Sequence, residues 1–345
     1  MSASCRKACV VGSGSWGTAF TGLVAPHVDE VALWCRSEEV ALGIAETGRN
    51  PRHLTGYELA ANVRATSDAA SALDGAGLVV LALPSAHLRA TCSRIAGSVP
   101  EGATVVVLTK GMEPGTHKLM LDVAADELGG AGRMAVLSGP NHAEEICQGQ
   151  VSAAVVAAND AQVAARVQEL VFSPSFRAYV SGDVTGVEVC GTVKNIVAIA
   201  CGLAAGLGAG DNTLAVLMTR GIAEIGRISA ALGGDPLTPM GLAGMGDLVA
   251  TCTSEHSRNR TFGEALARGE SLSDYESRTR MVVEGARAAM SVNELALVRG
   301  IEAPITAAVH GVLVDGVDLD SAKASLLGRL PREEFYGMTT PAGKE

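Results

Sequence analysis

A glycine-rich segment near the amino terminus constrains the fold more than any other feature of the sequence. Gly12, Gly14 and Gly17 form a G-x-G-x-x-G pattern that follows the apolar run 8–11 and precedes the helical pattern 18–25. In this context the first glycine permits a tight turn, the second lets backbone approach a pyrophosphate, and the third lets helix pack on strand. The amino terminus of the helix then faces negative charge. The pattern therefore predicts a dinucleotide site and not merely a connection between strand and helix.

Arg36 occupies the region that distinguishes the two nicotinamide dinucleotides. About twenty residues after the glycines, NAD-specific proteins usually place an acidic residue against the ribose. This chain instead has Trp34, Cys35 and Arg36 at the end of the second expected strand. A guanidinium there suits a 2′-phosphate, although a solvated Arg36 paired with Glu38 or Glu39 is the alternative. NADP(H) is favoured, and NAD(H) is not excluded.

Strand and helix patterns alternate in the first half of the chain, whereas only helical patterns continue after about residue 184. The expected strands are Ala8–Val11, Val31–Trp34, Leu78–Leu83, Thr104–Leu108, Met134–Leu137 and Ala153–Ala157. This rhythm is typical of a mostly parallel sheet covered by helices on both faces. Because 345 residues exceed what one core usually organises, we expect an α/β dinucleotide-binding domain over 1–186 and an all-α substrate-binding and catalytic domain over 187–345. Residues 339–345 are expected to form a disordered tail.

Charge and terminal sequence exclude several classes of protein. The formal net charge of −10 argues against non-specific binding to nucleic acid or to an anionic membrane. Residues 1–7 lead directly into a short apolar run without the pattern of a signal peptide, so a cytoplasmic location is expected. The eight cysteines form no C-x-x-C pair and mostly lie in apolar runs, which favours reduced core thiols over disulfides or a metal site.

Lys194 is the only charged residue in the long apolar run 189–210. The run is long enough to raise the question of a membrane span, but its five glycines and its Lys194-Asn195 pair favour the central helix of a soluble domain. Burial and neighbouring cations would lower the pKa of this lysine, so that it could protonate a forming alkoxide and take the proton back in reverse. We expect Lys194 to be the proton-transfer group, with a lysine reaching from a helix surface to solvent as the alternative.

Two later segments carry groups that suit a phosphorylated substrate. A glycine-rich turn is expected over 241–247, ending in the carboxylate of Asp247. The sequence S-R-N-R at 257–260 then combines hydroxyl, amide and guanidinium donors before a helix expected from Thr261 onward. Such a group can satisfy several phosphate oxygens, although a solvated basic turn shows the same pattern.

Two further segments follow expected strands, at the sheet edge where ligands of open α/β sheets gather. They are Lys110-Gly111 and the sequence G-P-N-H-A at 139–143. His142 is a second candidate for the general acid, but Lys194 is favoured, because a helix-start histidine is usually exposed.

Taken in order, these motifs resemble those of the bacterial NAD(P)-dependent glycerol-3-phosphate dehydrogenases. The resemblance covers roughly residues 8–330 and rests on G-S-G-S-W-G-T-A, L-T-K-G, G-P-N-H-A, V-K-N, G-L-A-G-M-G-D-L-V-A-T-C, S-R-N-R and V-E-G. It implies a Rossmann-type domain followed by an all-helical domain. It also implies hydride transfer between a nicotinamide dinucleotide and the pair sn-glycerol 3-phosphate and dihydroxyacetone phosphate, a reaction that feeds glycerophospholipid synthesis.

The resemblance also assigns site residues. Beside the loop glycines Gly12, Gly14 and Gly17, it implies contacts to the dinucleotide from Ser15, Trp16, Arg36, Lys110, Ala143, Arg258, Val282 and Glu284. It implies that the substrate is surrounded by Lys110, Gly139, Asn141, Lys194, Asp247, Ser257, Arg258 and Asn259, with Lys194 as proton acceptor in the oxidative direction. Asn141 stands where the family more often has Ser or Thr, although an amide can still donate to the substrate, and His142 replaces a common Phe as tolerated variation.

Two other functions remain open from the sequence. A two-domain hydroxyacid dehydrogenase would keep a lysine at the same place but would not require the group 257–259. A non-catalytic NADP(H) sensor would bind the dinucleotide without needing Lys194. Hydride chemistry requires no metal, and the apolar helical half is compatible with a homodimer.

Overall fold

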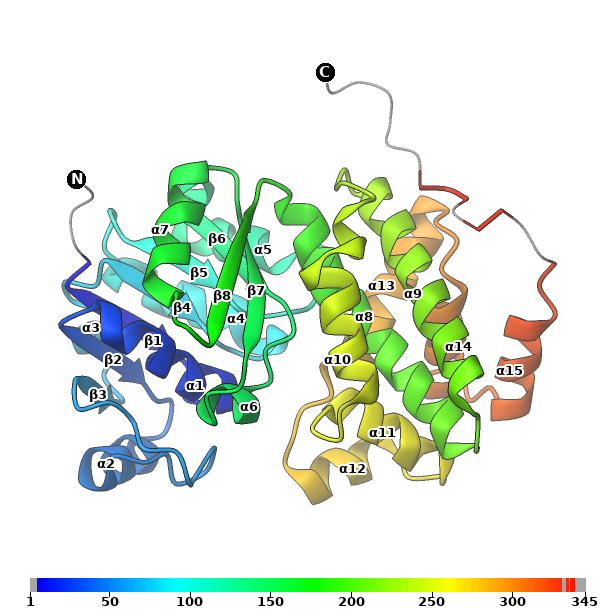
Figure 1. Ribbon diagram of the computed structural model, residues 1–345, viewed down its shortest axis with the longest axis horizontal. Coiled ribbons are helices and arrows are strands. Elements are labelled where there is room, and N and C mark those ends of the chain that lie inside the picture. The colour runs from blue at the N-terminus through cyan, green and yellow to red at the C-terminus, as the bar shows by residue number, and fades with distance from the viewer. Residues whose placement is uncertain (1–4, 331–332, 335, 339–345) are drawn as a thin grey trace. The chain divides into compact units, whose positions relative to one another are not determined.

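The computed structural model describes residues 5–330, 333–334 and 336–338, and the chain divides into two units (Figure 1). The first unit contains residues 1–109 and 120–184, and the second contains 110–119 and 185–345. No sequence pattern predicted that the segment 110–119 packs with the helical unit. The tail expected over 339–345 lies outside the described residues.

An eight-stranded sheet forms the centre of the first unit. Its strands are β1 (Lys7–Val11), β2 (Glu30–Trp34), β3 (Val63–Thr66), β4 (Leu78–Leu81), β5 (Thr104–Val107), β6 (Met134–Ser138), β7 (Ser152–Ala158) and β8 (Phe176–Ser181). The strand order is β3-β2-β1-β4-β5-β6-β7-β8, and the only antiparallel pair among these strands is β6 with β7. The strand order reverses at β1 and β4, so the glycine-rich loop that follows β1 lies at the switch point where such sheets bind ligands.

Helices connect and cover these strands. They are α1 (Ser15–Val24), α2 (Glu38–Thr47), α3 (Ala69–Leu73), α4 (Ser85–Ile95), α5 (Met120–Leu128), α6 (Ala143–Cys147) and α7 (Ala161–Val171). The central strands β1, β4 and β5 are almost wholly buried, which explains their continuous apolar sequences. The α/β class expected for this half is confirmed.

Eight α-helices build the second unit in the part of the chain that the structure describes. They are α8 (Val184–Gly206), α9 (Asp211–Ala231), α10 (Asp247–Thr253), α11 (Arg258–Ala267), α12 (Leu272–Thr279), α13 (Glu284–Arg299), α14 (Pro304–Leu313) and α15 (Leu319–Leu327). No strand follows Ser181 among the described residues. The all-α second half is therefore confirmed.

Helix α8 is the apolar helix that the sequence predicted around Lys194. It is long and apolar enough to cross a membrane, but 78% of its most apolar window is buried inside the protein. Its partner α11 approaches closely at two glycines, because a Cβ atom at Gly202 would overlap the carbonyl oxygen of Arg260 and one at Gly263 would overlap that of Ile199. This backbone contact holds the first turns of α11 against the helix that carries Lys194.

Candidate functional site

Close backbone contacts shape the glycine-rich loop after β1. Gly12 has a φ of +115°, and a Cβ atom there would overlap the carbonyl oxygen of Ala82. A Cβ atom at Gly17 would overlap the carbonyl oxygen of Gly12. Helix α1 begins at Ser15, three residues before the expected start, with Gly14 as an N-cap that has no side chain to offer. The first-turn N–H groups of α1 are thus available to an anion, as a bound pyrophosphate requires.

Asn50 fixes the conformation of this loop. Its side chain is fully buried, and Nδ2 donates hydrogen bonds of 2.9 Å to the carbonyl oxygen of Ser13 and to Oγ1 of Thr18. Its Oδ1 accepts from the backbone N–H groups of Arg52 and His53. The sequence analysis did not identify Asn50, since an asparagine before a proline signals only a turn.

Arg36 and Trp16 lie on the elements that the sequence predicted for them. Arg36 is exposed two residues beyond β2 and makes no ion pair within the described ranges, while Glu39 pairs with Arg52 at 2.6 Å. The indole Nε1 of Trp16 is buried and has no hydrogen-bond partner among the described residues. Both side chains thus keep donors that are not used within this unit.

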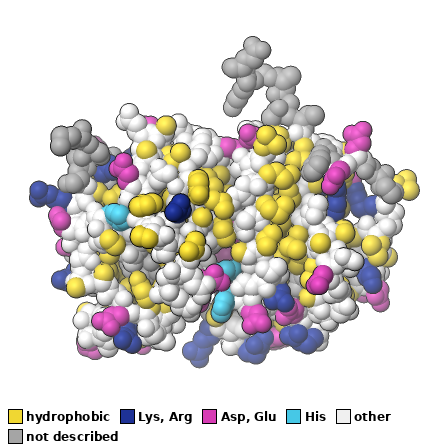
Figure 2. Space-filling view, in the orientation of Figure 1, with side chains coloured by type: hydrophobic (Ala, Val, Ile, Leu, Met, Phe, Trp, Pro, Cys, Tyr) yellow, Lys and Arg dark blue, Asp and Glu magenta, His cyan; other side chains and the backbone are white. Residues whose placement is uncertain are grey.

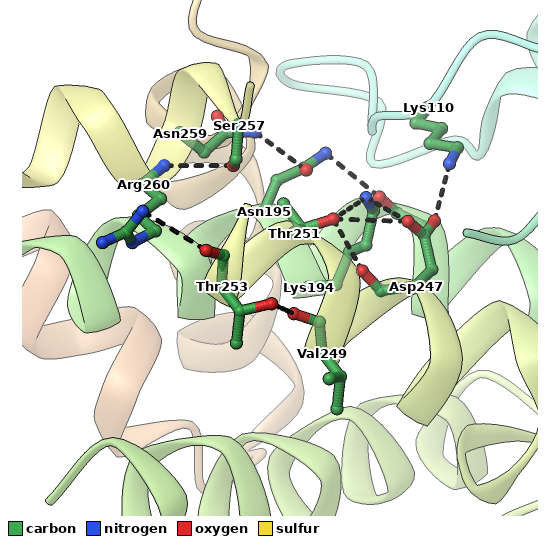
Figure 3. Close-up of polar contacts among 11 residues, drawn as sticks. Lys110, Lys194, Asn195, Asp247, Val249, Thr251, Thr253, Ser257, Asn259 and Arg260 are labelled. Atoms are coloured by element: carbon green, nitrogen blue, oxygen red, sulfur yellow. Dashed lines mark hydrogen bonds and ion pairs between the residues drawn. The ribbon is translucent and has the colours of Figure 1, made fainter. Parts of the chain in front are cut away.

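In the helical unit, Asp247 binds two lysine ammonium groups at once (Figure 3). Its Oδ2 lies 2.6 Å from Nζ of Lys110, and its Oδ1 lies 2.7 Å from Nζ of Lys194. Lys194 and Asp247 are 5% and 3% exposed, whereas the Lys110 side chain is 17% exposed. The structure therefore brings these three expected site residues together in one buried cluster of ion pairs.

Each member of this cluster comes from a different part of the helical unit. Lys194 projects from α8, and Asp247 is the first residue of α10. The segment Leu242–Gly246 before it is π-helical, so the expected glycine-rich turn is wrong: the absence of a side chain at Gly244 lets the chain coil tightly against Pro239. The segment beginning at Lys110 is fastened to α8 by a 3.1 Å hydrogen bond from Oγ1 of Thr192 to the carbonyl oxygen of Gly111.

The pKa values of both buried members of the cluster are lowered. This shift favours the neutral form of Lys194 and the charged form of Asp247. Burial lowers the pKa of Lys194 to about 8, against the attraction of Asp247 and with a further lowering by the charge of Lys110. Burial would raise the pKa of Asp247, but the charges and hydrogen bonds of the two lysines outweigh it and lower that pKa. Lys194 can therefore gain and lose a proton near neutral pH beside a carboxylate that stays ionised.

Thr251 forms a further hydrogen bond with the ammonium group of Lys194, although the sequence analysis assigned it no role. Its Oγ1 accepts a 2.6 Å hydrogen bond from Nζ of Lys194 and donates one of 2.6 Å to the backbone carbonyl oxygen of Asp247. Thr251 lies one helical turn after Asp247 on the same face of α10. That spacing is the only sequence signal that could have identified it.

A chain of buried amides joins three helices beside the cluster. Asn259 Nδ2 donates to Oδ1 of Asn195 at 2.9 Å, and Asn259 Oδ1 accepts from the backbone N–H of Gly285 at 2.9 Å. Asn195 in turn donates to the carbonyl oxygen of Gly191 within α8. Asn259 thus positions α11 and α13 beside α8, and only its second amide hydrogen remains for the expected substrate contact.

Helix α11 begins within the S-R-N-R segment, whereas the sequence predicted that the segment would precede a helix. The start expected at Thr261 is wrong by three residues, because Ser257 acts as N-cap and its Oγ accepts from the backbone N–H of Arg260 at 3.3 Å. Arg258 is exposed in the first turn, where helix N–H groups and a guanidinium together suit a phosphate. Val282 and Glu284, two expected dinucleotide contacts, lie just before Gly285 at the start of α13.

The remaining expected site residues lie in the first unit after β6. A Cβ atom at Gly139 would lie 2.6 Å from the carbonyl oxygen of Ala153, so this position has no room for a side chain. Nδ2 of Asn141 is buried without a hydrogen-bond partner among the described residues, which leaves it a free donor. His142 is the half-buried N-cap of α6, and Ala143 is the first residue of that helix.

Comparisons with known proteins agree over nearly the whole chain. The family model described as NAD-dependent glycerol-3-phosphate dehydrogenase N-terminus matches residues 7–164, and the model of the C-terminus matches residues 183–324. The chain is 47% identical to glycerol-3-phosphate dehydrogenase [NAD(P)+] of Nocardia farcinica over 95% of this chain and 99% of that protein. It is 46% identical to the enzyme of the same name from Moorella thermoacetica, over 93% and 95%. A crystal structure of glycerol-3-phosphate dehydrogenase from Coxiella burnetii is similar with a TM-score of 0.90 and 35% identity, over 95% of this chain and 100% of that chain.

Proposed function

The chain belongs to the NAD-dependent glycerol-3-phosphate dehydrogenase family, and from this premise we propose that it interconverts sn-glycerol 3-phosphate and dihydroxyacetone phosphate in the cytoplasm. The product of the reductive direction would feed glycerophospholipid synthesis. The observation that carries the proposal is the buried cluster in which Asp247 holds Lys194 and Lys110. We also propose a homodimer formed through the helical unit, supported by the exposed apolar side chains of Leu297 and Val298 on α13.

The first unit fits a nicotinamide dinucleotide. Contacts at Gly12 and Gly17 leave no room for side chains, and the uncapped first turn of α1 suits a pyrophosphate. The exposed guanidinium of Arg36 favours NADP(H), while NAD(H) remains usable. When bound, the nicotinamide supplies or accepts the hydride.

Lys194 is the proposed proton donor and acceptor. In reduction its ammonium group protonates the oxygen on C2 of dihydroxyacetone phosphate as hydride reaches that carbon, which yields the secondary alcohol. In oxidation the neutral amine takes the hydroxyl proton as hydride leaves. Asp247 and Thr251 hold Nζ of Lys194 in one place throughout, so little reorganisation accompanies the transfer.

The start of α11 is the proposed phosphate site. Arg258 would bind the phosphate together with first-turn N–H groups, beside the capping hydroxyl of Ser257 and the remaining amide hydrogen of Asn259. We also propose Gly139 and Asn141 as substrate contacts, as the family resemblance implies. Binding energy from the phosphate would position C2 for hydride transfer.

The direct test follows oxidation of NADPH by the purified protein with dihydroxyacetone phosphate. NADH and unphosphorylated dihydroxyacetone serve as comparisons under the same conditions. Rapid turnover that requires the phosphate would support the proposed reaction and the proposed phosphate site. Bound NADPH without turnover would favour a sensor, and turnover with hydroxyacids would favour a related dehydrogenase.

The pH dependence should be opposite in the two directions. Because the pKa of Lys194 in the free enzyme is about 8, kcat/KM for oxidation of sn-glycerol 3-phosphate should rise as pH increases through that value. For reduction of dihydroxyacetone phosphate it should fall, since the protonated form is required. Initial rates measured in both directions across this range test the prediction, and flat profiles in both would contradict it.

Arg36→Ala should weaken binding of NADPH much more than binding of NADH. Loss of a charge-assisted contact to the 2′-phosphate should raise the Kd for NADPH by about tenfold or more, whereas NADH has no such phosphate. Fluorescence titration of both dinucleotides measures the difference. Arg52→Ala, which removes a nearby exposed arginine paired with Glu39, is the control. Equal losses for both dinucleotides in the Arg36 variant would refute the role.

A further inference from the structure

A large cavity lies within the helical unit. Its volume is about 1160 Å³, slightly above the range of roughly 300–1,000 Å³ common for small-molecule sites. The walls come from α8, α9, α14 and α15, together with Arg329, Leu330, Glu333 and Tyr336. Neither Lys194 nor Asp247 lines this cavity, so the proposed reaction does not explain it.

One end of the cavity is apolar. Leu207, just after α8, and Val216 in α9 line it while remaining more than half exposed, and Leu203 and Val309 extend the same wall. Helix α15 has no buried residue, although its leucine Leu326 lines the cavity. Figure 2 shows apolar side chains gathered over the helices of this unit. A ligand with an apolar chain would cover these surfaces, which the described part of the chain leaves exposed.

The other end is cationic. Arg220 and Arg227 line the cavity from the second half of α9, and Lys323 and Arg329 line it from α15 and the residue run that follows. The described lining has only two carboxylates, and that of Glu302 is already paired with Arg329. This excess of positive charge occurs in a protein of net charge −10. At a rise of about 1.5 Å per residue, Arg220 and Arg227 lie about 6 Å and about 16 Å along α9 beyond Val216, so the cationic lining residues of α9 follow its apolar ones along the helix.

Arg227 supplies the strongest indication of an anion. The residue is 5% exposed, and its Nη1 is buried with no hydrogen-bond partner among the described residues. Its Nε donates to the carbonyl oxygen of Glu302 at 2.8 Å, and its guanidinium lies 4.6 Å from the ring centroid of Tyr336. Burial lowers the pKa of Arg227, which shows how poorly this charge is solvated. A buried guanidinium with an unused donor is costly unless an anion approaches it.

The nearest buried carboxylate does not meet this need. Glu224, one helical turn before Arg227 on α9, is fully buried. Its oxygens accept from the backbone N–H groups of Ile305 and Thr306 and from Oγ1 of Thr306, at 2.6–2.9 Å. Glu224 therefore caps α14; its charge works against the lowering of the pKa of Arg227, but it accepts no hydrogen bond from Nη1, which keeps its unused donor.

We propose that this cavity binds a long-chain fatty-acid anion. The acyl chain lies between Leu207 and Val309, and the carboxylate lies at Arg220 and Arg227. A guanidinium matches the planar carboxylate with paired hydrogen bonds, and the apolar walls select the chain. If a second copy of this chain covered the cavity instead, it would have to place acidic side chains against the cationic residues.

Isothermal titration calorimetry of the full chain with dodecanoate, below the concentration at which it forms micelles, tests the proposal. Saturable binding of one dodecanoate per chain is expected. Dodecyltrimethylammonium has the same chain and the opposite charge, and butanoate has the same head group and a short chain. Both should bind at least about tenfold more weakly. Equal binding of the two dodecyl compounds would mean nonspecific detergent-like adsorption and would overturn the proposal.

Variants locate the binding. Ala308→Trp fills the cavity from α14 and Arg220→Glu reverses a charge at its wall, so each should weaken dodecanoate binding by about tenfold or more. Leu42→Trp introduces the same indole side chain at an exposed position on α2 of the other unit, and this variant should bind dodecanoate normally. Retained NADPH binding and an unchanged circular dichroism spectrum would show that each variant is folded. If Ala308→Trp does not fold, the result with Arg220→Glu decides the outcome.

Two results would overturn the site. One is unchanged dodecanoate binding in both cavity variants. The other is absence of dodecanoate binding together with a dimer, seen by sedimentation, that Ala308→Trp dissociates, which would assign the cavity to a second copy. Neither result bears on turnover with dihydroxyacetone phosphate, so the proposed reaction is tested separately.

Discussion

Lys194→Ala is expected to reduce kcat by about 10²–10⁴-fold or more in both directions, because it removes the group that transfers the proton. Binding of NADPH should change little, since the expected dinucleotide loop lies in the first unit. Steady-state rates and fluorescence titration of NADPH separate the two effects.

Lys118→Ala, which removes another lysine of the helical unit, is the matched control and should keep nearly full activity. A Lys194→Ala enzyme with normal turnover would refute the proposed mechanism. One that had lost NADPH binding as well would point to general damage instead of a missing proton donor.

Asp247→Ala should have the largest effect on stability. This substitution removes the carboxylate that the ammonium groups of Lys194 and Lys110 both contact, and Lys194 is almost fully buried. Breaking a buried ion pair in this way costs about 3–5 kcal/mol in the free energy of unfolding. Denaturant unfolding of the variant and the parent protein measures this loss.

The loss should shrink as pH rises. The pKa of Lys194 is about 8 in the folded protein and 10.5 for an ordinary lysine, so the folded state binds fewer protons between these values. Removing Asp247 lowers the folded pKa further, so the unfolding free energy of the variant already rises with pH below about 8, where that of the parent does not, and the difference between them shrinks over that range. Glu46→Ala, at an exposed carboxylate of α2, is the control; an equally small loss in both variants would contradict the buried cluster.

The fold could be predicted from the sequence where burial produces continuous apolar runs. The central strands β1, β4 and β5 are buried on both faces, and each was expected close to its observed position. The strands β3 and β8 at the two edges of the sheet were missed. They carry exposed and charged residues such as Arg64 and Arg177, so they lack the apolar run that marks a buried strand.

The candidate site was predictable as a set of residue types but not as a set of contacts. Lys194 stood out because a single charge in an apolar helix is unusual, and Asp247 because it ends a glycine-rich segment. The pairing of Lys110 with Asp247 joins residues 137 positions apart. Asn50 and Thr251 were missed for the same reason, since their importance depends on tertiary neighbours that no local pattern reports.

Residues 110–119 belong to the helical unit, although the residues on both sides of them in the sequence belong to the first unit. This arrangement limits how the gene could be rearranged. A single recombination crossover near residue 184 would join a new nucleotide-binding half to the old helical half and would discard Lys110, the second cation on Asp247. A functional exchange needs either a matching lysine in the incoming half or a second pair of crossovers around residues 110–119. The two halves of this enzyme are therefore expected to have been inherited together, even though each has a core of its own.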